Sequence, residues 1–77
     1  MPKLYLVSRI DYRGSNPIKV FAIKDNAKQY CGECNVAVKL VMNSENREEE
    51  FSLIKEFDSE AVLCDSIRYE VEEIQSE

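Results

Sequence analysis

Two cysteines separated by two residues are the clearest candidates for chemistry in this sequence, in the motif Cys31-Gly32-Glu33-Cys34. A thiol pair at this spacing can cycle between dithiol and disulfide when a helix N-terminus stabilises the attacking thiolate. Cys64 could serve as a third ligand for zinc, with a carboxylate or a second subunit's pair completing the site, because the chain has no histidine. One interpretation of Cys31, Cys34 and Cys64 is therefore a redox or metal site.

The competing interpretation places the same thiols in the core. The helical pattern around them starts at Asp25 or Asn26, about two turns before the pair, so both cysteines would lie inside the helix rather than at its exposed end. Free cysteine commonly fills buried positions as a small hydrophobic residue. A single pair of cysteines at this spacing, without further ligands or a family pattern, is a weak motif. We expect Cys31 and Cys34 to pack against a sheet, and we predict no cofactor.

A resemblance to glutaredoxins and thioredoxins covers roughly residues 18–42, where an apolar run is followed by CGEC and a helical pattern. It implies a thiol-redox activity of Cys31 and Cys34. Those families also place a proline opposite the thiols, whereas both prolines of this chain, Pro2 and Pro17, come before the motif. This departure weakens the redox interpretation.

Other familiar catalytic arrangements do not fit the composition. Without histidine there is no Ser-His or Cys-His couple, and two glycines, Gly14 and Gly32, do not make a phosphate-binding loop. The glutamates at 48–50 and at 70, 72 and 73 form charge runs of the kind that usually faces water. We predict no catalytic residue and a protein that is not an enzyme.

Charge is divided unevenly along the chain, whose net charge is −5. Residues 1–43 carry seven Lys/Arg and three Asp/Glu, whereas residues 44–77 carry three and twelve. An acidic protein is repelled by phosphate backbones, so direct nucleic-acid binding is not expected. The sequence has no long apolar run, no leader-like start and an odd number of cysteines, which together predict a cytoplasmic protein without a membrane segment.

The first part of the chain has the pattern of a β-hairpin. Residues 3–12 alternate, with Leu4, Leu6, Ile10 and Tyr12 on one parity and Arg9 and Asp11 on the other, which predicts a strand with one buried face. Residues 13–17 are turn formers, and residues 18–23 form a second apolar run. Pro17 lacks a backbone donor, so we expect it at the start of a strand or on an edge.

A helix is predicted next, because apolar residues recur at intervals of three and four. They are Ala27, Tyr30, Cys31, Cys34, Val38 and Val41. Gly32 would cost about 1 kcal/mol inside that helix, and Val36, Val38 and Leu40 could instead alternate as a strand. We favour the continuous helix over this alternative.

The remaining elements are a short helix and a last strand. Ser44 offers a cap, Glu48–Glu50 suit the first turn of a helix, and Phe51, Ile54 and Phe57 give residues 46–57 an amphipathic pattern. Residues 67–72 alternate as a half-exposed strand that we expect to pair with the first. The predicted fold is one α+β domain over residues 1–77, in the order β-β-α-α-β, with one or two helices on one face of a three-stranded antiparallel sheet.

Function is predicted from side chains that suit a protein interface. Tyrosine combines a large apolar body with a polar tip, and acidic clusters offer charge. The interaction candidates are Tyr5, Tyr12, Tyr69, Glu48, Glu49 and Glu50. A domain of this size buries only about 60% of its unfolded surface, so a protein partner or a second copy of the chain is a reasonable source of additional stability.

The opening segment, KLYLVSRIDYRGSNPIKVFAIKDNAKQY, resembles the start of small uncharacterised bacteriophage and bacterial proteins in which a hairpin leads into a helix and a last strand. That resemblance implies a role in binding and modulating a host or phage protein. The resulting hypothesis is a small acidic protein-binding module that modulates or inhibits its partner and that can form a homodimer. The alternative is a redox or metal-binding protein that uses Cys31 and Cys34.

Overall fold

The chain begins with a hairpin whose turn is shorter than predicted. The computed structural model, which describes residues 3–75, places strand β1 at Lys3–Asp11 and strand β2 at Gly14–Phe21. Gly14 has a φ of 102°, a conformation that glycine adopts without a Cβ penalty, and this allows the chain to reverse at residues 12–13. The prediction of a turn over all of 13–17 is therefore wrong: residues 14–17 belong to β2.

Strand β3, at Arg68–Gln75, completes the sheet on the other side of β1. The order is β2-β1-β3 and both pairings are antiparallel, which confirms that the last strand pairs with the first. Pro17 lies on the edge strand β2 opposite Ser8, next to a register shift in the ladder. A missing backbone donor is tolerated at such a position.

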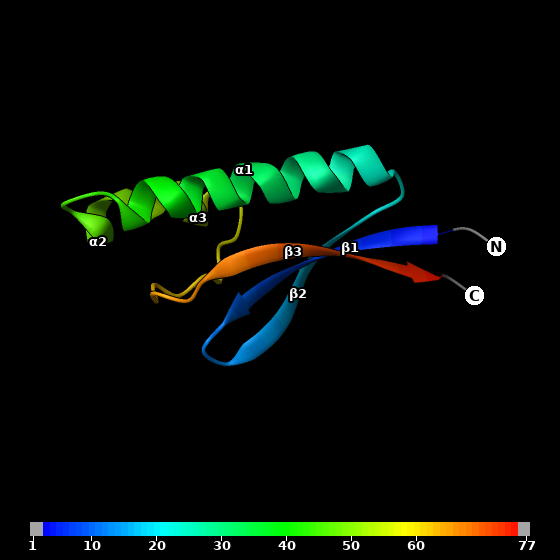
Figure 1. The fold of residues 1–77 in the computed structure, drawn as a ribbon, viewed down its shortest axis with the longest axis horizontal. Helices are drawn as coiled ribbons and strands as arrows, with labels where there is room; N and C mark the ends of the chain where they lie inside the picture. Colours follow the sequence, from blue (N-terminus) through cyan, green and yellow to red (C-terminus); the bar gives the residue numbers. More distant parts are fainter. Residues whose placement is uncertain (1–2, 76–77) are drawn as a thin grey trace.

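Helix α1, at Lys24–Met42, is continuous and lies over one face of the sheet (Figure 1). Its buried side chains are Ala27, Cys31, Cys34, Ala37, Val38 and Val41. The continuous helix is thus confirmed over the strand alternative for residues 36–42. The helix begins slightly earlier than the predicted start at Asp25 or Asn26, because Ile23 occupies the N-cap position. Asp25 lies in the first turn, where its charge is favourable against the helix dipole.

The second predicted helix consists of two short ones, α2 at Arg47–Glu50 and α3 at Ser52–Lys55. Asn46 rather than Ser44 occupies the N-cap position of α2. Phe51 and Ile54 are buried in the core, and α3 contacts α1. The architecture is an α+β fold in the order β-β-α-α-α-β, with the predicted single second helix divided at Phe51.

Strand β1 presents the opposite parity to the core from the one that its apolar residues predict. Val7, Arg9 and Asp11 are buried, and Val7 packs in the core with residues of α1. Successive side chains of a strand alternate between faces, so Leu4, Leu6 and Ile10 lie on the face away from α1. Arg9 and Asp11 can be buried because each has charged or polar partners there.

Candidate functional site

The paired thiols lie inside the protein. Cys31 and Cys34 are 7% and 0% exposed, and Cys64 is half-buried in the segment before β3; all three are free thiols. Asn35 Nδ2 lies 3.6 Å from Cys31 Sγ, whereas Cys64 Sγ lies 3.8 Å from Ser66 Oγ. Within residues 3–75, no three side chains of His, Cys, Asp or Glu are placed to hold a metal ion together.

Their surroundings disfavour the thiolate form. Burial raises the pKa of Cys34 to about 12, with smaller contributions from the neighbouring Cys31 and Asp58. Burial also raises the pKa of Cys31, and Glu70 adds to that rise. A redox-active cysteine needs the opposite, an accessible sulfur with a lowered pKa. Both thiols lie in the hydrophobic core with their protonated forms favoured.

A cluster of buried charges joins the sheet to the segment after α3. Arg9 Nη1 donates to Asp58 Oδ2 at 2.5 Å, Arg9 Nε donates to Asp11 Oδ2 at 3.0 Å, and the Tyr69 hydroxyl donates to Asp58 Oδ2 at 3.0 Å. The side chains of Arg9, Asp11 and Asp58 are 4%, 0% and 4% exposed. No buried side-chain polar atom of the described residues lacks a hydrogen-bond partner. The cluster is therefore fully satisfied.

Protonation states within this cluster follow from its contacts. Burial tends to raise the pKa of Asp11, but hydrogen bonds from the Arg13 amide and from the Arg9 and Arg13 guanidinium groups outweigh it and hold that pKa below the usual value. Burial, reinforced by the charge of Asp58, raises the pKa of Tyr69 well above its usual value. The carboxylate of Asp11 and the neutral phenol of Tyr69 are thus the stable forms.

The charge cluster fixes Asp58, and its neighbour Phe57 is held by a second set of contacts. The Tyr30 hydroxyl donates to the Phe57 carbonyl oxygen, and the two rings meet edge to face with centroids 5.9 Å apart. The Tyr30 ring also lies 5.4 Å from that of Phe21. These contacts hold Phe57 in place against α1.

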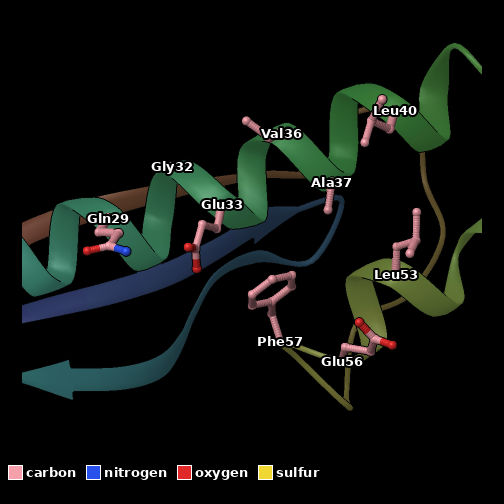
Figure 2. Close-up of a pocket in the computed structure, with 9 residues that line it drawn as sticks. All are labelled: Gln29, Gly32, Glu33, Val36, Ala37, Leu40, Leu53, Glu56 and Phe57. Carbon is pink, nitrogen blue, oxygen red and sulfur yellow. The ribbon is translucent and has the colours of Figure 1, made fainter.

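Phe57 forms part of a groove between α1 and α3, with a volume of about 590 Å³ (Figure 2). Figure 2 shows Glu33 and Ala37 pointing from α1 toward Phe57, and Leu53 pointing from α3 toward α1. The lining residues are Gln29, Gly32, Glu33, Val36, Ala37, Leu40, Leu53, Glu56 and Phe57. Val36 and Leu40 are 59% and 58% exposed, so this part of α1 presents large apolar side chains to solvent.

Gly32 lies in this groove without a packing reason inside the chain. A Cβ built at Gly32 would meet no atom within 4 Å. Glycine inside a helix costs about 1 kcal/mol relative to alanine, so Gly32→Ala should raise the free energy of unfolding by about that amount in urea denaturation. A destabilised Gly32→Ala variant would contradict the open space above this residue.

The charged residues that line the groove are all acidic. Glu33 lies on the α1 wall, Glu56 follows α3 on the other wall, and Gln29 is neutral. The apolar residues that line the groove with them are Val36, Ala37, Leu40, Leu53 and Phe57. The groove therefore combines an apolar surface with two carboxylates that lie on opposite sides of it.

The predicted interaction residues do not form one surface. Tyr12 is 68% exposed in the hairpin turn, beside the Arg13 guanidinium, and Tyr5 is half-buried against the core. Tyr69 is only 3% exposed because it lies on the core-facing side of β3, so its prediction as a surface contact needs correction. The glutamates at 48–50 are exposed on α2.

The groove residues were not predicted as a site. In the sequence, Val36 and Leu40 belong to a segment that could form either a helix or a strand. Leu53 and Phe57 belong to the separate amphipathic pattern of residues 46–57. The one local signal was Gly32, a helix-disfavouring residue in the middle of a predicted helix.

Comparison with known proteins leaves this site without a precedent to draw on. The chain matches no protein-family model, no curated protein and no solved structure. None of the helices that the structure describes in residues 3–75 has the length and apolar composition to cross a membrane.

Proposed function

We propose that this chain is a small non-enzymatic protein-binding module whose groove between α1 and α3 takes an amphipathic helix of a partner protein, with lysine or arginine beside its apolar face. The observation that carries the proposal is the exposure of Val36 and Leu40 on a groove with acidic side chains on both walls. By covering such a helix, the module would modulate or inhibit the protein that contains it.

A helix fits the groove because both walls are themselves helical. The α1 wall uses residues 29, 32, 33, 36, 37 and 40, and the other wall uses 53, 56 and 57, so both follow spacings of three and four. The α1 wall spans about 16 Å, or three helical turns. A third helix laid between them would present residues at the same spacings, as in other helix-in-groove complexes.

Charge favours a basic partner. Glu33 and Glu56 are exposed, and a lysine or arginine on each side of the partner's apolar face could pair with one of them. Such rim pairs contribute mainly to the association rate and to discrimination against acidic sequences, and salt weakens them. The apolar contacts with Val36, Leu40 and Leu53 would supply most of the affinity.

The groove is also preorganised, since its walls are held by contacts inside the chain. Phe57 is fixed by Tyr30, and Asp58 is fixed by Arg9 and Tyr69. A surface that is already ordered loses less conformational entropy on binding. Gly32 leaves open space where the backbone of the partner helix could approach α1.

Selection from a displayed library of random peptides, with the intact chain as bait, tests this proposal without a known ligand. Enriched peptides should carry apolar residues at i, i+3 or i+4, and i+7, be rich in lysine or arginine, and become helical on binding. Leu40→Glu should weaken their affinity by about thirtyfold, since one exposed leucine buried by the partner contributes about 2 kcal/mol.

Ile23→Glu is the matched control, because Ile23 is also 58% exposed but does not line the groove. It should leave the affinity within about twofold of the unmodified chain. Enriched peptides that bind the Leu40→Glu variant as tightly as the original chain would contradict the site. Groove-dependent peptides without basic residues would contradict the charge of the partner.

A further inference from the structure

The sheet has a second face that α1 does not cover, and in Figure 1 no helix of the described residues 3–75 lies over it. Strand alternation and pairing place an apolar group there, made of Leu4, Leu6, Ile10, Val20 and Ile74. Val20 is 50% exposed, and the other four are partly exposed. Ser8, Arg68, Glu70 and Glu72 share this parity, and together with the apolar group they form the open face of the sheet.

Across β1 and β3, side chains of the open face lie in three successive rows, each made of two residues that are directly opposite each other in the ladder. In the β1–β3 ladder, Ile10 lies opposite Arg68, Ser8 lies opposite Glu70, and Leu6 lies opposite Glu72. Along β1 the order is apolar, small, apolar, and along β3 it is one cation followed by two carboxylates. A half-turn about the middle row would place the outer rows of two copies opposite each other, Leu6 against Ile10 and Arg68 against Glu72.

We propose that a second copy of this chain covers the open face, related by a twofold axis along the row of Ser8 and Glu70. In that arrangement Leu6 of each copy packs on Ile10 of the other. Arg68 of each copy pairs with Glu72 of the other. Ser8 lies at the centre, where a small side chain allows two sheets to approach to about 10 Å.

A second copy suits this face because a twofold interface must be complementary to itself. The open face meets that condition in both apolar contacts and charge, since its basic and acidic ends exchange places under the rotation. Association would also cover apolar surface that a domain of this size cannot bury alone. The groove lies on the other side of the sheet, so the dimer leaves it free for a partner helix.

Glu70 is the unfavourable element of the arrangement, because the two copies bring their Glu70 carboxylates together at the axis. Each is offset within its own chain by Arg68, whose Nε lies 3.3 Å from Glu70 Oε1. Removing this charge should therefore strengthen association. Glu70→Gln is expected to tighten the dimer, whereas the same change at exposed Glu45, off the sheet, should not.

Sedimentation velocity of the intact chain across a concentration series tests the proposal. The unmodified chain should form a dimer, and Arg68→Glu or Glu72→Arg alone should each raise the dissociation constant by about tenfold, because both symmetric pairs become repulsive. The double variant, Arg68→Glu with Glu72→Arg, should recover most of the loss. Both residues are exposed, so circular dichroism should show the unmodified fold in every variant.

Lys39→Glu is the matched control, since it makes the same charge change as Arg68→Glu on an exposed position of α1. It should leave the dissociation constant unchanged. A chain that stays monomeric at the highest concentration would overturn the proposal. So would a dimer that Leu40→Glu disrupts, or one in which the double variant fails to recover. None of these results depends on whether the groove binds a peptide.

Discussion

Replacing Asp58 with alanine is expected to lower the free energy of unfolding by about 3 kcal/mol, because removing one partner of a buried ion pair leaves the other without full compensation. Arg9 would keep Asp11 but lose its contact with Asp58, and the Tyr69 hydroxyl would lose its acceptor. For a domain of this size, that is a large part of the total stability. Urea denaturation followed by circular dichroism measures the change.

Asp65→Ala provides the control for that experiment. Asp65 also pairs with an arginine, Arg47, at 2.9 Å, but its side chain is 91% exposed. Loss of this surface ion pair should cost less than about 1 kcal/mol. Equal losses in the Asp58 and Asp65 variants would show that burial does not distinguish the two pairs and would contradict the structural role of the cluster.

The second large effect concerns the reactivity of Cys34. At about pH 8, alkylation of Cys34 in the folded chain should be at least about a thousandfold slower than in the unfolded chain, because its pKa rises from 9.0 to about 12 and only the thiolate reacts. The absence of exposed surface at Cys34 slows the reaction further. Mass spectrometry of samples quenched over time gives the rate at each cysteine.

Cys64 serves as the internal reference, since it is half-buried and lies outside the pair. It should be modified first in the native protein, and all three cysteines should react at similar rates in denaturant. Rapid native modification of Cys34 would mean that the thiolate is accessible. That result would favour the redox interpretation of Cys31 and Cys34 over a structural one.

Much of the fold was predictable because it depends on patterns that are local in the sequence. The recurrence of Ala27, Cys31, Cys34, Val38 and Val41 identified the buried stripe of α1, even with Gly32 inside it. The alternation around Tyr69 and Val71 identified β3. These patterns specify which elements form, and a chain with two early strands and one late strand leaves few ways to build a sheet.

The parity of β1 was not predictable in the same way. Leu4, Leu6 and Ile10 made one face look like the core, yet Arg9 and Asp11 face the core because Asp58 lies there to pair with Arg9. That partner is 49 residues away in the sequence, so no local pattern reveals it. The groove was missed for the same reason, since it exists only where α1 meets the segment at 53–57.

Amide chemical shifts of the isotope-labelled chain, recorded while a selected basic amphipathic peptide is added, test most directly whether the groove is where a partner binds. The expected outcome is a set of saturable changes along one side of α1 from Gln29 to Leu40 and at Leu53 to Phe57, smaller at high salt. Saturable changes located instead on β1 and β3, or a spectrum that the peptide leaves unaltered, would contradict the assignment.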